Sequence, residues 1–87
     1  MPEFKRSTRK NKKYMVRYNG KWIHFGDTRY KHYEDTTGLG LYSHLNHGNS
    51  ARRANYLTRA TGIKNKSGEL TYHDKSSPNY YSVRYLW

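Results

Sequence analysis

Aromatic or aliphatic side chains recur at every second position on either side of Asn19-Gly20. They are Tyr14, Val16 and Tyr18 within Tyr14–Tyr18, and Ile23 and Phe25 within Lys21–Phe25. Alternation with a period of two indicates half-buried β-strands. An Asn-Gly pair between two such segments is typical of a type I′ turn, which needs two residues with positive φ. A two-residue turn also sets the register, so that Tyr18 pairs with Lys21 and Tyr14 with Phe25. The sequence therefore predicts a β-hairpin over residues 14–25.

The predicted register gives the hairpin two different faces. The face expected to enter the core carries Tyr14, Val16, Tyr18, Ile23 and Phe25. The other face carries Met15, Arg17, Trp22 and His24. Arg17 stands opposite Trp22, which predicts a cation–π pair worth ~0.5–1 kcal/mol at an exposed site. This second face is a binding surface, or it is covered by another element or by a second subunit.

The segment after the hairpin predicts a first short helix. Asp27 is a favourable N-cap for a helix over residues 28–35, and Tyr30 and Tyr33 would share its buried face. Glycines at positions 38 and 40 end this helix. In the segment that follows, Tyr42 and Leu45 are the expected core contacts.

A second helix is predicted over residues 51–60, with Asn49 or Ser50 as its cap and Gly62 as its stop. Its helical periodicity separates two stripes. The apolar stripe consists of Ala54, Leu57 and Thr61, whereas the basic stripe consists of Arg52, Tyr56 and Arg59, with Arg53 beside it.

The last part of the chain predicts a loop and then an extended segment. Residues 63–78 are polar and rich in turn-forming residues, whereas residues 79–87 are aromatic and favour β-structure. We expect this end to close the core or to cross to a second subunit. The predicted fold class is α+β, with an N-terminal β-hairpin, two short helices and an extended C-terminal segment.

Positive charge dominates the chain, which carries 17 Lys and Arg against 6 Asp and Glu, a net charge of +11. Six bases and one acid lie in residues 1–13, which we interpret as a disordered basic arm, so the single domain expected over residues 14–87 keeps eleven bases and five acids, or +6. A charge this high predicts a polyanionic partner. The sequence shows no amphipathic basic helix of the kind that binds a membrane surface. We therefore expect the partner to be nucleic acid, bound through its phosphates. The expected nucleic-acid-binding residues are Lys5, Arg6, Arg9, Lys10, Lys12, Lys13, Arg17, Lys21, Trp22, Arg52, Arg53, Tyr56 and Arg59.

Catalytic and metal-binding patterns are weak. Glu34 and Asp35 are adjacent, and neighbouring residues on a helix point about 100° apart, so they form no acid–base dyad. His44 and His47 could share one side of a turn, but without cysteine a structural zinc site would need an unusual ligand set. We therefore expect that the protein is not an enzyme and that it binds no metal and no cofactor. A His-dependent nuclease is a remaining alternative, although it would need a flanking ββα arrangement that the sequence does not indicate.

Two family resemblances bear on this interpretation. The first is to a family of small basic uncharacterised proteins of large nucleocytoplasmic DNA viruses, including marseillevirus-like giant viruses. It is carried by Asn19–Asp27, Tyr30, Tyr33, Asp35, Tyr42–Gly48, Arg52, Arg53, Asn55, Tyr56, Arg59 and Tyr85–Trp87. The second, over Lys13–Gly26, is similar to the start of the small sheet domain with which tyrosine integrases bind arm-site DNA. In that domain three strands lie against the major groove and a helix packs behind, yet here no clear third strand follows Phe25.

The first resemblance implies a viral protein, located in the virion and in the host cytoplasm or nucleus during infection. We expect a largely sequence-independent DNA-binding protein that helps to package or condense the viral genome, and we expect it to form a homodimer. The alternatives are a structural virion protein acting through protein–protein contacts and an integrase-like arm-site module.

Overall fold

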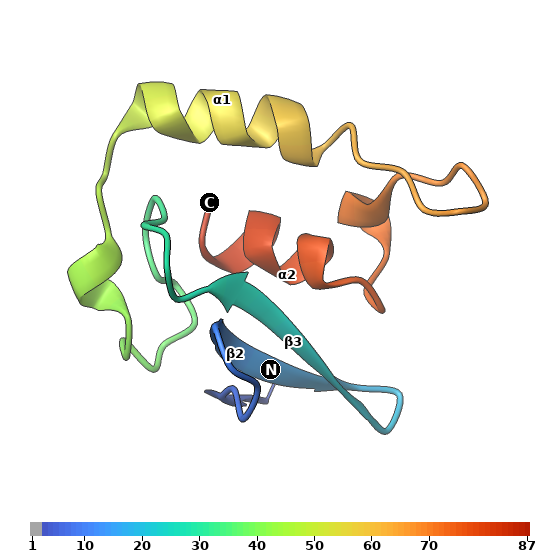
Figure 1. Cartoon of the computed structure of the whole chain (residues 1–87), viewed down its shortest axis with the longest axis horizontal. Helices are drawn as coiled ribbons and strands as arrows, with labels where there is room; N and C mark the ends of the chain where they lie inside the picture. The colour runs from blue at the N-terminus through green and yellow to red at the C-terminus, as the bar shows by residue number, and fades with distance from the viewer. Residues whose placement is uncertain (1–2) are drawn as a thin grey trace.

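The computed structural model describes residues 3–87 and has an α+β fold, as the sequence predicts. A three-stranded antiparallel sheet comes first and the helices follow (Figure 1). The strands are β1 (Phe4–Arg6), β2 (Lys12–Tyr18) and β3 (Lys21–Asp27). The helices are α1 (Ser50–Ala60) and α2 (Pro78–Tyr85), with short 3₁₀ turns at Ser43–Leu45 and Thr71–His73.

The predicted hairpin is confirmed in position and register. Strands β2 and β3 pair Tyr18 with Lys21 and Tyr14 with Phe25. Asn19 and Gly20 have φ values of 51° and 75°, as a type I′ turn requires. Local turn chemistry was therefore sufficient to set the pairing of the two long strands.

The predicted disordered arm is wrong over its described part, and its residues 1–2 lie outside the described residues. Phe4–Arg6 forms β1, which pairs with β2 so that Phe4 stands opposite Val16. The Phe4 ring packs against Phe25 and Tyr85, with ring centroids 6.0 and 4.7 Å away. Phe4 and the edge of β2 order this short basic strand, and the Lys5 and Arg6 side chains remain exposed.

The helix predicted over residues 28–35 is also absent from the structure. The Asp27 carboxylate accepts a hydrogen bond from the backbone N–H of Arg29, which makes a tight turn in place of a helix cap. Further along, His32 is fully buried and forms an isolated bridge with Asn46. The same property that favours Asp at a helix start, a side chain that binds nearby backbone N–H groups, here favours a turn.

Residues 78–85 form a helix, α2, instead of the predicted extended segment. Ser77 caps it by accepting from the backbone N–H of Asn79, and Pro78 occupies the first turn, where a proline suits a helix. Helix α2 lies against the sheet (Figure 1), and Tyr81 and Leu86 are buried in the core with the sheet residues. The expectation that this end docks into the core is confirmed, although as a helix.

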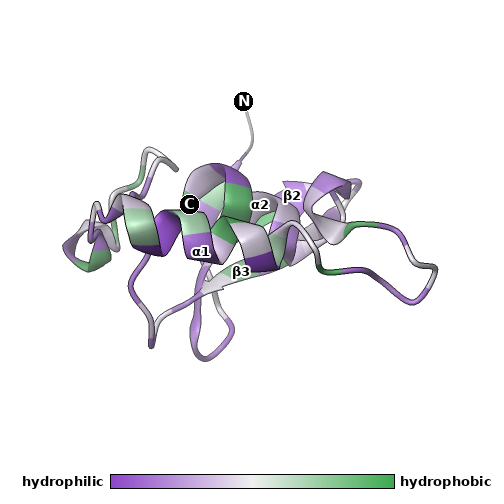
Figure 2. Cartoon of the chain, turned by 90° about the horizontal axis from the view of Figure 1, so that it is seen from above, coloured by the Kyte–Doolittle hydropathy of each residue, from purple (hydrophilic) through white to green (hydrophobic). Residues whose placement is uncertain are grey.

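The core lies between the sheet and α2. It contains Tyr14, Val16, Ile23, Phe25, Tyr81 and Leu86, and the four sheet residues all belong to the predicted core face. Tyr18 and Tyr42 pack against its edge, half-buried. Helix α1 lies on the far side of α2 from the sheet, and hydrophilic residues recur along its exposed length (Figures 1 and 2).

We expect Gly26→Ala to destabilise the fold by ~2–4 kcal/mol, which urea denaturation would measure. Gly26 has φ of +77°, and a Cβ there would lie 2.9 Å from Leu86 Cδ1 and 3.1 Å from Lys13 Cβ. Gly20→Ala is the matched control, because its φ is +75° but no atom lies within 4 Å of an added Cβ. Backbone strain alone should cost it ~1 kcal/mol. Equal losses in the two variants would contradict the close packing at Gly26.

Candidate nucleic-acid interface

Few of the positive charges are neutralised within the protein. Across residues 3–87 one ion pair forms, between Arg29 and Asp27, with 2.8 Å from Nη2 to Oδ2. This contact and the backbone N–H of Arg29 hold the pKa of Asp27 at about 2. The other described Lys and Arg side chains have no carboxylate within 4.0 Å, so most of the charge is left to interact with solvent or with a polyanion.

The outer face of the sheet, which α2 does not cover, joins cations from two strands around Trp22. The Lys5 ammonium lies 5.3 Å from the Trp22 ring centroid and the Arg17 guanidinium 5.7 Å from it. The Arg17 contact was predicted from the register, whereas Lys5 joins it because β1 pairs with β2. Met15 and His24 complete this face, and Ser7 Oγ is 2.7 Å from His24 Nδ1. We call Lys5, Met15, Arg17, Trp22 and His24 the outer sheet face.

The other predicted N-terminal and hairpin residues have different positions. Arg9 and Lys10 are exposed in the turn between β1 and β2, and Lys21 is exposed at the start of β3, opposite Tyr18. Arg6 instead turns to Tyr42, donating to its hydroxyl at 3.1 Å with its guanidinium 5.4 Å from the ring centroid. Arg6 therefore has a structural contact, although its side chain remains exposed.

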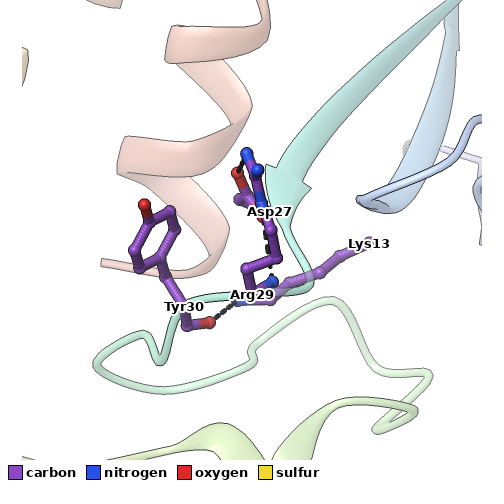
Figure 3. Close-up of polar contacts among 4 residues, drawn as sticks. All are labelled: Lys13, Asp27, Arg29 and Tyr30. Carbon is purple, nitrogen blue, oxygen red and sulfur yellow. Dashed lines mark hydrogen bonds and ion pairs between the residues drawn. The ribbon is translucent and has the colours of Figure 1, made fainter.

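Lys13 is not the surface cation that the sequence predicted, since it is only 2% exposed. Its ammonium group donates to the Tyr30 carbonyl oxygen at 2.9 Å and to His32 Nδ1 at 2.7 Å; Figure 3 shows the first of these bonds. Burial lowers the pKa of Lys13 to about 8, while Asp27 and Asp35 act in the opposite direction. Lys13 thus holds the turn after β3 against the sheet.

The partner of Lys13 must be a neutral histidine. A lysine ammonium can only donate, so His32 Nδ1 accepts and Nε2 carries the proton. This Nε2–H donates to Asn46 Oδ1 at 2.6 Å. Burial lowers the pKa of His32, as does the nearby Lys13 charge, whereas the bond to Asn46 and the charge of Asp35 raise it. Protonation of His32 would place a second donor against Lys13.

Helix α1 divides the predicted basic stripe into packing residues and exposed residues. Tyr56 stacks on Trp87, with centroids 4.0 Å apart and planes 9° apart. Arg53 donates to the Trp87 carbonyl oxygen at 2.6 Å and lies over the Tyr33 ring. Tyr56 and Arg53 therefore join α1 to Trp87, just after α2. Arg52, Arg53 and Arg59 are all exposed, but only Arg53 has this contact with Trp87.

The predicted apolar stripe of α1 is correspondingly misplaced. Ala54 is exposed and Leu57 and Thr61 are half-buried, whereas Ala60 is the buried residue of the helix. The packing face is rotated because the large flat ring of Tyr56 fits against Trp87, which outweighs the burial of a small Ala54 side chain.

A cleft of about 720 Å³ opens where α1, the end of the hairpin and the end of α2 meet. We call it the α1 cleft. Its lining comprises Lys12, Lys13, Gly26, Asp27, Tyr30, Lys31, Arg52, Asn55, Tyr56, Arg59, Ser82, Leu86 and Trp87. Five of these residues are Lys or Arg and one, Asp27, is acidic and already paired with Arg29.

Sequence reasoning did not place Tyr30 or Lys31 at the α1 cleft. Tyr30 was expected on a buried helix face but is 65% exposed, and Lys31 was not among the expected binding residues. Both come to the cleft because the segment after Asp27 turns instead of forming a helix. The Asp27-Thr28-Arg29 sequence, which suits a turn closed by the Asp side chain, was the available signal.

A metal site and a membrane-spanning helix each have a characteristic pattern, and the described residues match neither. Within residues 3–87 no three His, Asp or Glu side chains gather in a way that would hold a metal ion. Among the same residues, no helix combines the length and apolar character needed to cross a membrane. His47 accepts from the backbone N–H of Asn49 through Nδ1, and its ring lies 5.1 Å from that of Trp87, a packing role.

Comparison with known proteins gives one match. Residues 3–37 are similar to a family of unknown function, DUF5754. The matched segment contains the whole sheet and the turn with Lys13's two partners. No curated protein and no solved structure is significantly similar to the chain.

We expect the free energy of unfolding to decrease as the pH falls from 7.5 to 5. The lowered pKa of His32 means that the unfolded chain binds a proton at a higher pH than the folded chain does. The loss should begin near the ordinary histidine pKa of about 6.5 and continue down to the folded pKa. His24 and His47 have lowered pKa values and act in the same direction.

Urea denaturation at several pH values would measure this dependence in the unaltered protein and in two variants. His32→Asn should weaken the pH dependence, whereas His44→Asn, at an exposed position, should keep it. A pH dependence that is identical in His32→Asn would show that the buried network does not control acid stability.

Proposed function

We propose that this protein binds DNA largely independently of sequence, through phosphate contacts made by its unpaired cations. The observation that carries the proposal is the outer sheet face, where Lys5 and Arg17 flank the ring of Trp22 without carboxylate partners. Cations held beside an aromatic ring can bind phosphate while the ring contacts a sugar or base. Arg9 and Lys10, exposed in the turn between β1 and β2, add further cations beside this face.

The architecture supports this proposal. A three-stranded sheet with one face covered by a helix and the other open is the arrangement implied by the resemblance to integrase arm-site domains. The third strand here is β1, which precedes the hairpin, whereas the resemblance required a strand after Phe25. We infer phosphate contacts rather than base recognition, because the cations sit on short exposed elements with no fixed bidentate partner.

The biological setting proposed is genome packaging or condensation by a non-enzymatic virion protein of a giant virus, present in the virion and in the host cytoplasm or nucleus. It rests on the viral resemblance and on the charge of +11. A structural virion protein that binds an acidic protein is the second candidate, favoured by the same unpaired cations. The two candidates differ in their response to purified DNA.

We expect DNA affinity to fall ~10³–10⁵-fold between 50 and 200 mM salt, alike for unrelated sequences, if roughly six to ten phosphates are contacted. Fluorescence anisotropy of labelled duplexes across a salt series would measure it. Lys5→Gln with Arg17→Gln should lower the slope of log K against log salt by ~2. Lys64→Gln with Lys66→Gln is the charge-matched control, because these exposed lysines lie on a loop outside both surfaces.

Two results would contradict the proposal. A flat salt response would mean that phosphates do not dominate binding. Equal losses in the sheet pair and the loop pair would mean that net charge, and not the outer sheet face, attracts DNA.

We also expect a homodimer, with a mass near twice the 10.4 kDa of the chain by light scattering. Of the two grounds for this expectation, the aromatic C-terminal end and the strand edges, the second remains. Trp87, which could have crossed to a second subunit, stacks on Tyr56 of its own chain. The edges of β1 and β3 carry no further strand within residues 3–87, and pairing along an edge would cover them. A monomeric mass at all protein concentrations would contradict the dimer.

A further inference from the structure

We propose that the α1 cleft is a second nucleic-acid site, separate from the outer sheet face, and that it binds a single strand. The inference rests on the proposed affinity for nucleic acid but concerns a different surface and a different form of the partner. Among the five cationic residues that line the cleft, Lys12, Lys31, Arg52 and Arg59 are the four with accessible side chains.

The cleft brings together cations that are far apart in the sequence. Arg52 and Arg59 lie seven positions apart on α1, about two turns, and so share one side of the helix. Lys12 begins β2 and Lys31 lies in the turn after β3. Charged groups from three segments therefore border one cleft, and none of the four cations has a carboxylate within 4.0 Å among residues 3–87.

The one acidic side chain of the cleft is already neutralised. This residue, Asp27, is held by Arg29 through two guanidinium hydrogen bonds of 3.0 and 2.8 Å (Figure 3). Lys13, at the base of the cleft, adds positive charge but is used by Tyr30 and His32. The expected ligand is thus an anion with several phosphate groups, which could interact with the separated cations together.

Size and aromatic content favour a strand over a duplex. A volume of about 720 Å³ is in the range of clefts that enclose small ligands, roughly 300–1,000 Å³, so a few nucleotides can enter but a base-paired cylinder cannot. Tyr30, 65% exposed, offers its ring at the cleft, with Arg29 5.8 Å from the ring centroid. Cations along a groove together with an accessible aromatic ring are the features that bind single strands without sequence preference.

The two tryptophans allow each surface to be observed separately. Trp22 lies on the outer sheet face and Trp87 lines the α1 cleft. Trp22→Phe leaves Trp87 as the only fluorescent indole, and Trp87→Phe leaves Trp22. Each variant is titrated with oligo-dT of 12 nucleotides, with a 12-base-pair duplex and with ATP, at equal concentrations of phosphate.

We expect oligo-dT to change the Trp87 fluorescence and the duplex to change mainly that of Trp22. Arg52→Gln with Arg59→Gln should weaken the Trp87 response to oligo-dT at least ~10-fold, because two phosphate contacts are lost. Glutamine forms helices well, so α1 should persist, which circular dichroism would verify. Lys64→Gln with Lys66→Gln removes the same charge outside the cleft and should change the oligo-dT affinity within ~2-fold.

Several outcomes would overturn the inference and leave the proposed function standing. Oligo-dT could bind by anisotropy without altering Trp87, or the duplex could alter Trp87 as strongly at equal phosphate. Saturation by ATP at the same phosphate concentration would instead identify a site for free nucleotides. If neither oligo-dT nor the duplex bound in any assay, the proposed function itself would fail.

Discussion

The arrangement of the α1 cleft depends on one buried ammonium group. Lys13 joins strand β2 to the segment after β3, through the Tyr30 carbonyl oxygen and His32 Nδ1. Through His32 it is connected to Asn46, which also accepts from the backbone N–H of Asp35. A charge buried in this way is costly unless its hydrogen bonds are made, and here the depressed pKa of Lys13, about 8, reflects that cost. The turn that carries Tyr30 and Lys31 is consequently held at the side of α1, and the cleft between them is a product of this network.

Aromatic rings replace carboxylates as the neighbours of many cations. Guanidinium groups lie 5–6 Å from ring centroids at Arg6, Arg17, Arg29, Arg53 and Arg84. A ring positions a cation without neutralising it, whereas an ion pair would remove the charge from the surface field. Ten tyrosines and six acids are therefore a coherent composition for a small protein that must order its surface and remain strongly positive. The cost is repulsion between the surface cations of a protein with a small core, and a polyanionic partner would relieve this repulsion.

Sequence reasoning succeeded where local chemistry decided the structure. The Asn19-Gly20 turn set the register of β2 and β3, and with it the core face and the Arg17–Trp22 contact. The cap at Asn49 likewise located α1. Sequence reasoning failed at Asp27, because its side chain accepts the same kind of backbone hydrogen bond in a helix cap and in a tight turn. The turn forms because it allows His32 to be buried. Sequence reasoning failed also after Pro78. The aromatic segment there is compatible with a strand or a helix, and the choice depends on the sheet face that it covers.

By itself the sequence determined the α+β class, the central hairpin, α1 and the excess of positive charge, because each depends on nearby residues or on composition. Only the tertiary structure decided which cations are available. It buried Lys13, turned Arg53 to the Trp87 carbonyl, brought Lys5 to Trp22 and placed Lys31 with Arg52 and Arg59 around one cleft. These outcomes depend on contacts between residues distant in the chain, and no local pattern of charge encodes which side chain a neighbouring element will cover.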